Sequence, residues 1–261
     1  MGILNVTPDS FSDGGEYLAL NAALSQAANM ANSGADIIDI GGESTRPGAS
    51  AVTVEEELQR VIPVVEAIHK NINVIISVDT SKPEVMEAAV NAGAGLINDV
   101  RALQEDGAMA MAALLDVPVS LMHMQGQPRT MQESPDYEDV TDDVIRFLRG
   151  RIADCELAGI PRSNLLIDPG FGFGKRLEHN YKLLRDLHGF KSLDLPLLVG
   201  ISRKSMVGAV LDDAPVGDRV WGSVGAAVVA VERGADIVRV HDVKETREAL
   251  LGAGLLREQS A

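Results

Sequence analysis

The chain has 261 residues, 46% of them hydrophobic, which is enough to bury the core of one large α/β domain. A formal net charge of −15 argues against a nucleic-acid partner, and no apolar run approaches the roughly 20 residues of a membrane span. Polar residues interrupt the apolar start, so no secretory signal is expected. The lone cysteine, Cys155, excludes an intrachain disulfide and is typical of a cytoplasmic protein.

Eight short apolar runs recur along the chain, and polar residues follow each of them at once. Continuous apolar runs, as opposed to alternating ones, are typical of parallel strands that are buried on both faces. The predicted strands are residues 2–4, 37–40, 74–78, 95–97, 117–122, 165–167, 197–201 and 237–238. Residues 33–40, 91–98 and 233–240 read as three degenerate copies of one unit, a helix end at glycine and then a strand.

Helical patterns separate the predicted strands. They cover residues 18–32, 54–69, 83–92, 108–115, 140–158, 178–187, 219–233 and 243–256. Eight β-α units predict an α/β protein of the (β/α)8 TIM barrel class, with residues 1–261 in a single domain. The rival fold is an open doubly wound sheet, but the glycine-rich fingerprint typical of that fold does not follow the first strand.

Carboxylates and carboxamides follow four of the strands, at Asn5, Asp79, Asn98 and Asp168. In a barrel the carboxyl ends of all strands meet at one mouth. Buried polar groups need partners, so the four imply a polar ligand, either a nitrogen heterocycle or a hard cation such as Mg²⁺. A capping or turn role for any one of them is about equally plausible.

Basic side chains follow the last two strands. Arg239 and His241 are two residues apart and so share a strand face, where an arginine can stack on a ring or grip phosphate. Residues 202–205 open a helix, and Lys204 adds charge and Ser205 a hydroxyl to an anion-binding helix start. The alternative interpretation is a serine cap with solvated basic neighbours.

Loops after several strands carry further signals. Residues 168–175 are glycine-rich, so their backbone can approach a ligand closely, and Phe171 and Phe173 can wall an aromatic substrate. The long polar loops 7–17, 44–51 and 125–137 are expected to be lids or ordinary connections. No Ser-His-Asp signature and no His/Cys metal spacing is present, which disfavours hydrolase and zinc chemistry.

Taken together, the motifs resemble the dihydropteroate synthase family. Residues 2–15 and 39–48 resemble its two signatures, and shorter matches follow in order at 79–80, 98–99, 122–126, 168–175, 200–205 and 239–241. The resemblance covers essentially the whole chain. Family members usually carry a short segment ahead of the first strand, whereas this sequence opens on the strand itself.

The resemblance implies an Mg²⁺-dependent transferase that condenses 6-hydroxymethyl-7,8-dihydropterin pyrophosphate with p-aminobenzoate. It also implies that the protein is cytoplasmic and forms a homodimer through outer helices. The implied pterin ligands are Asp79, Asn98, Met122, Asp168, Lys204 and Arg239. The implied pyrophosphate ligands are Asn5, Thr45, Arg46, Arg239 and His241, with Asn5 also at the metal. The implied p-aminobenzoate site is Phe11, Pro47, Phe173, Lys204 and Ser205, and the implied catalytic residues are Asp13, Arg46 and Lys204.

Such a reaction fits the residue inventory, because pyrophosphate departure leaves a cation that Asp13 can stabilise and the aniline nitrogen then attacks. No strong base or protein nucleophile is needed. One alternative is a pterin-binding methyltransferase, which residues 46–48 and 202–205 argue against because a methyl donor carries no pyrophosphate. A second alternative is a pterin-binding paralogue that sequesters its ligand without turnover.

Overall fold

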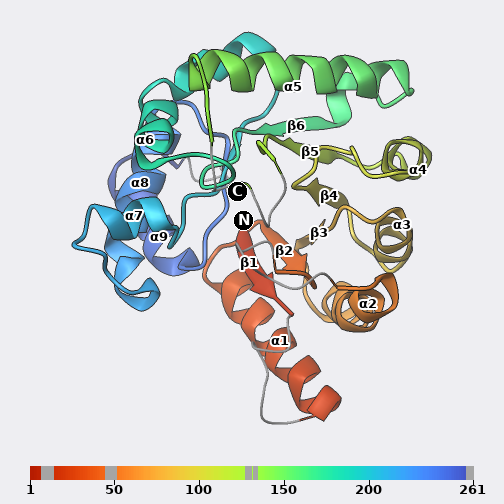
Figure 1. Ribbon diagram of the computed structural model, residues 1–261. Helices are drawn as coiled ribbons and strands as arrows, with labels where there is room; N and C mark the ends of the chain where they lie inside the picture. Colours follow the sequence, from red (N-terminus) through yellow and green to blue (C-terminus); the bar gives the residue numbers. More distant parts are fainter. Residues whose placement is uncertain (7–14, 45–51, 127–130, 132–134, 257–261) are drawn as a thin grey trace.

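The computed structural model describes residues 1–6, 15–44, 52–126, 131 and 135–256. Its strands gather at the centre, and helices surround them (Figure 1). The strands are β1 (Gly2–Asn5), β2 (Ile37–Gly41), β3 (Ile75–Asp79), β4 (Leu96–Asp99), β5 (Val119–Met122), β6 (Leu165–Asp168), β7 (Leu198–Val199) and β8 (Ile237–Val238). Every pairing between them is parallel.

The strands close into a barrel in chain order. Strands β1 to β6 form one sheet and β7 pairs with β8. Single parallel bridges, Ile167 with Leu197 and Gly2 with Val240, join β6 to β7 and β8 to β1. At the second seam the Ile3 amide donates to the Val240 carbonyl at 3.0 Å. The predicted (β/α)8 barrel is therefore confirmed.

Helices follow the strands on the outside of the barrel (Figure 1). The α-helices are α1 (Gly15–Asn32), α2 (Val54–Asn71), α3 (Pro83–Asn91), α4 (Ala108–Leu115), α5 (Val140–Leu157), α6 (Leu177–Arg185), α7 (Ser205–Ala209), α8 (Val220–Glu232) and α9 (Val243–Gly252). Short 3₁₀ segments are η2 (Arg162–Asn164), η3 (Leu187–Leu193) and η4 (Val216–Arg219).

Local sequence explains where these helices begin and end. Thr53 and Glu56 form a reciprocal capping box at the start of α2, and the Asp139 carboxylate caps α5. The expected helix 243–256 ends earlier, at Gly252, because Gly254 takes a left-handed conformation (φ 69°) that stops the helix. The expected helix 178–187 ends at Arg185 and the chain continues as η3.

Alternation along the strands separates the barrel interior from the helix-facing core. Ile38 and Ile40 are completely buried in the hydrophobic core, whereas Asp39 between them bonds to Arg239, which directly follows β8. Asp39 therefore points into the barrel, and its neighbours point toward the helices. No helix within the described part of the chain is long and apolar enough to cross a membrane.

Candidate active site

The register of the barrel aligns the polar strand ends in one row. Asn5 pairs with Gly41, Gly41 with Asp79, and Asp79 with Asn98. Parallel strands in register direct paired residues to the same side. On the next strands Met122 pairs with Asp168. The structure therefore brings five of the predicted site residues to the carboxyl ends of five strands, as sequence reasoning expected.

Asp39 connects this row to Arg239 and was not predicted as a site residue. It is completely buried, and its Oδ2 accepts from Arg239 Nε at 2.6 Å and from Asn98 Nδ2 at 3.0 Å. Arg239 also donates to Asp79 Oδ2 at 2.9 Å. The guanidinium is thus held between two carboxylates across the barrel interior. A carboxylate inside an otherwise apolar strand was the sequence signal for this role.

Burial dominates the electrostatics of the carboxylates. It raises the pKa of Asp79 to about 7, against the opposing charge of Arg239 and with a further upward contribution from Asp39. Burial also raises the pKa of Asp168, although the Lys204 charge opposes it and Gly170 N donates to Oδ1 at 2.7 Å. Near neutral pH Asp79 therefore sits between its acceptor-only and donor-capable forms.

Lys204 lies between the carboxylates and the glycine-rich loop. Its Nζ donates to the Phe171 carbonyl at 2.6 Å and lies 4.7 Å from the centroid of the Phe173 ring. Burial lowers the pKa of Lys204 to about 8, although Asp168 opposes the shift. Ser205 is exposed and begins α7, which is only five residues long. The predicted helix start is therefore a single turn, and Lys204 supplies its charge.

The ends of β7 and β8 are fastened to each other beside this lysine. His241 Nδ1 and Ser202 Oγ are 3.0 Å apart, and the His241 amide donates to the same hydroxyl oxygen at 3.1 Å. The next residues along, Arg203 and Asp242, form an ion pair. Sequence reasoning placed His241 at the mouth, and the structure adds the serine that orients it.

Five predicted site residues lie outside the described residues: Phe11, Asp13, Thr45, Arg46 and Pro47. Their roles remain predictions. Within the described ranges, no group of three or more His, Cys, Asp or Glu side chains is arranged to hold a metal ion. Mg²⁺ is commonly bound by one or two protein oxygens together with substrate phosphates and water. A single protein oxygen, such as that of the Asn5 carboxamide at the end of β1, fits that mode of binding.

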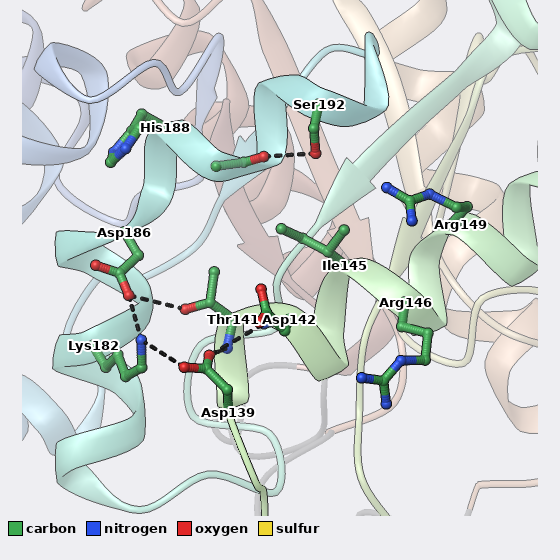
Figure 2. A pocket seen from close by; sticks show the side chains of 11 residues that line it. Asp139, Thr141, Asp142, Ile145, Arg146, Arg149, Lys182, Asp186, His188 and Ser192 are labelled. Carbon is green, nitrogen blue, oxygen red and sulfur yellow. Dashed lines mark hydrogen bonds and ion pairs between the residues drawn. The ribbon is translucent and has the colours of Figure 1, made fainter.

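A hollow of about 610 Å³ lies elsewhere, on the outer layer between α5, α6 and η3 (Figure 2). Lys182 sits at one end of it, ion-paired to Asp139 at 3.1 Å and to Asp186 at 2.5 Å. Its lining includes none of the predicted site residues. We therefore assign the active site to the barrel mouth, where the buried charges converge.

Comparison with known proteins defines the class of this barrel. The family model described as "Pterin binding enzyme" matches residues 1–241, so the chain belongs to the pterin-binding enzymes. The relatives narrow the class further. Dihydropteroate synthase from Escherichia coli is 60% identical over 96% of this chain and 88% of its own length, and that from Haemophilus influenzae is 56% identical over 96% and 90%.

Solved structures agree with this assignment. The dihydropteroate synthase of Yersinia pestis, in complex with a sulfonamide drug, superposes with a TM-score of 0.93 at 57% identity, covering 97% of this chain and 92% of that one. The Xanthomonas albilineans enzyme in complex with 7,8-dihydropteroate has a TM-score of 0.89 at 49% identity, with 97% and 91% covered. Within the pterin-binding enzymes, the similarity is thus to dihydropteroate synthases.

Proposed function

We propose that this chain condenses 6-hydroxymethyl-7,8-dihydropterin pyrophosphate with p-aminobenzoate, giving 7,8-dihydropteroate and pyrophosphate in folate biosynthesis. The observation that carries the proposal is the braced row of polar strand ends, in which Asp39 and Asp79 hold Arg239 beside Asn98. The similar X. albilineans structure that holds 7,8-dihydropteroate supports the same chemistry.

The pterin would bind along this row. A pterin edge alternates N–H donors with nitrogen and oxygen acceptors, and Asp79, Asn98 and Asp168 offer both kinds of partner. Arg239 is fixed at two of its nitrogens and is 18% exposed, which leaves a flat guanidinium able to stack on the ring. Met122 and Lys204 complete the proposed pterin pocket.

The pyrophosphate would lie where β8 returns to β1. His241, oriented by Ser202, would supply a hydrogen bond there, together with Thr45 and Arg46. We propose that the carboxamide oxygen of Asn5 binds Mg²⁺. When bound, Mg²⁺ would neutralise pyrophosphate charge and so improve the leaving group.

The transfer step needs no protein nucleophile. The bond between the pterin methylene carbon and the pyrophosphate oxygen breaks, and pyrophosphate leaves with the electron pair. Asp13 would stabilise the methylene cation that remains. The p-aminobenzoate nitrogen then forms the C–N bond and releases its proton to the departing pyrophosphate. The residues proposed to hold the p-aminobenzoate ring are Phe11, Pro47, Phe173, Lys204 and Ser205. Exclusion of water would protect the cation.

We further propose a homodimer of cytoplasmic, one-domain chains. An apolar surface at α7, η4 and the start of α8 supports the dimer, because Val210, Leu211, Val216 and Trp221 are all exposed there, Trp221 by 74%. Exposed apolar patches of this kind commonly mark interfaces between proteins. Analytical ultracentrifugation of the wild type and of Trp221→Glu tests the proposed dimer. We expect the wild type to sediment as a dimer and the variant as a monomer.

Product formation tests the proposed function. The protein is incubated with dihydropterin pyrophosphate, radiolabelled p-aminobenzoate and Mg²⁺, and labelled dihydropteroate is separated by chromatography. The expected result is product that requires Mg²⁺ and declines when a sulfonamide is added. Tight binding of pterin pyrophosphate without any product would indicate a sequestering paralogue and would contradict the proposal.

A further inference from the structure

Lys175 is a buried lysine that the proposed mechanism does not use, and burial lowers its pKa well below the ordinary value although Asp168 opposes the shift. Its side chain is 3% exposed, yet none of the described carboxylates forms an ion pair with it. Its Nζ instead donates to the carbonyls of Gly170 at 2.9 Å and Phe173 at 3.0 Å. It lies 2.9 Å from His123 Nδ1 and 3.4 Å from the His123 carbonyl. Four acceptors thus surround a group that has three N–H donors when charged.

The loop between β6 and α6 wraps around this ammonium group. Gly170 and Gly174 adopt left-handed backbone angles of +71° and +59°. A Cβ atom at either position would collide with backbone, at the carbonyl oxygens of His123 and Gln125 respectively. Only glycine permits both the angle and the approach. The loop is therefore pressed against the end of β5, with Lys175 enclosed between the two segments.

His123 is held as firmly as the loop. Its ring packs edge-on against Phe147 of α5, with the ring centroids 4.9 Å apart. Burial lowers the pKa of His123 to about 2, and the neighbouring Lys175 charge adds to the effect. The imidazole is thus neutral, and it can accept from Lys175 at Nδ1 while Nε2 carries the proton.

The outer side of the same loop faces the site. The Phe171 carbonyl accepts from Lys204, and the Phe173 ring lies against the same ammonium. Phe173 is therefore linked to both lysines, because its carbonyl accepts from Lys175 while its ring meets Lys204. A shift of this loop would move the aromatic wall and the lysine together.

We propose that Lys175 is a positioning residue that sets the p-aminobenzoate side of the site by holding the loop between β6 and α6 against His123. The role rests on the proposed function. The pterin side depends less on this loop, because Asp79, Asn98 and Arg239 lie on other parts of the barrel. Asp168 and Lys204 do contact the loop, through Gly170 N and the Phe171 carbonyl. Loss of the buried amino group leaves the Gly170 and Phe173 carbonyls without this donor, and such unsatisfied groups favour rearrangement of the loop.

The test compares Lys175→Met with Lys182→Met, a control at a half-exposed lysine of α6 that does not contact the loop. For Lys175→Met, we expect KM for p-aminobenzoate to rise about 10-fold or more, because the displaced loop no longer places its binding contacts. The dissociation constant of pterin pyrophosphate, measured without p-aminobenzoate, should change less than about 3-fold. Lys182→Met should change neither. Equal changes in both constants, or an unchanged KM, would overturn the proposal.

A second pair of variants decides the matter if Lys175→Met does not fold. His123→Asn keeps an acceptor near the Nδ1 position, whereas His123→Leu has similar volume and none. Both lose the ring that packs on Phe147, so their difference isolates the hydrogen bond to Lys175. KM for p-aminobenzoate should be lower in His123→Asn than in His123→Leu. Equal KM values in the two variants would contradict the role of Lys175.

Failure of the proposed function would be visible separately, as absence of dihydropteroate with the wild type. The loop claim would then be read from amide hydrogen exchange, which needs no substrate. Exchange at residues 170–174 should be faster in Lys175→Met than in the wild type and in Lys182→Met. Unchanged exchange would refute the positioning role independently of the reaction.

Discussion

Replacing Asp79 with asparagine should stabilise the fold while weakening pterin binding. Burial raises the pKa of Asp79 from 3.8 to about 7 even though Arg239 lies beside it. Because the folded-state pKa exceeds the unfolded value, the folded protein retains this proton between about pH 4 and pH 7. Wild-type stability therefore declines as pH rises through that window, and the loss is complete above pH 7.

The expected gain in the free energy of unfolding follows from the pKa shift of Asp79. A change of about three pKa units corresponds to about 4 kcal/mol at 1.36 kcal/mol per unit. Asparagine can still accept from Arg239, and Asp39 remains paired to that guanidinium. Because Asp79→Asn also gives up the charged contact with Arg239, which opposes the gain, we expect a net stabilisation of about 2 kcal/mol at pH 8. For a chain of this length that is about 4–8 °C in Tm.

Urea unfolding of the ligand-free protein at pH 5 and pH 8 measures this effect. At pH 5 the gain should shrink to about a third, because most of the titration window lies above that pH. Asp106→Asn, at an exposed aspartate, is the control and should change neither value. An Asp79→Asn protein that is less stable at pH 8, or equally stabilised at both pH values, would refute the claim that burial outweighs Arg239.

The same substitution should lower pterin affinity about 100-fold, since a hydrogen bond to a charged group contributes about 1.5–3 kcal/mol. Calorimetric titration with dihydropterin pyrophosphate at pH 8 measures the loss. A variant that is both more stable and equally tight in binding would show that Asp79 does not touch the pterin.

Three further predictions concern other residues of the proposed mechanism. Burial lowers the pKa of Lys204 to about 8, so its charge is lost above that pH and turnover should fall as pH rises through about 8; a flat rate profile between pH 7 and 9.5 would contradict this role. Asp13→Ala and Arg46→Ala should each lower turnover about 100-fold with pterin affinity largely kept. If calorimetry shows that pterin affinity collapses, those two assignments are wrong. Ser202→Ala removes the hydroxyl beside His241 and should raise KM for pterin pyrophosphate about 5-fold. Steady-state kinetics that show an equal rise of KM for p-aminobenzoate would argue against this role of Ser202.

Strand positions could be predicted from the sequence because buried parallel strands are continuously apolar and the polar residue after each run marks the carboxyl end. Asn5, Asp79, Asn98 and Asp168 were found in this way, and the barrel register aligns three of them. The expected strand 197–201 is shorter in the structure, as β7 pairs regularly with β8 only at Leu198–Val199.

Side-chain partners could not be predicted in the same way. The ion pair between Asp39 and Arg239 joins residues 200 positions apart, so no local pattern encodes it. Asp39 sits within an apolar run that predicts a strand, and Lys175 ends the glycine-rich segment 168–175, whose pattern does not indicate that the lysine is buried. The burial of these two side chains follows from closure of the barrel and from folding of the loop, which only the structure shows.

The stoichiometry of the reaction is the decisive measurement of transfer to p-aminobenzoate at the barrel mouth. Released pyrophosphate and labelled dihydropteroate are measured in the same Mg²⁺-containing samples, with the wild type and with Asp79→Asn. We expect one dihydropteroate for each pyrophosphate with the wild type, and a large loss of both products with the variant. Pyrophosphate released without dihydropteroate, or equal activity in the two proteins, would contradict transfer to p-aminobenzoate at this mouth.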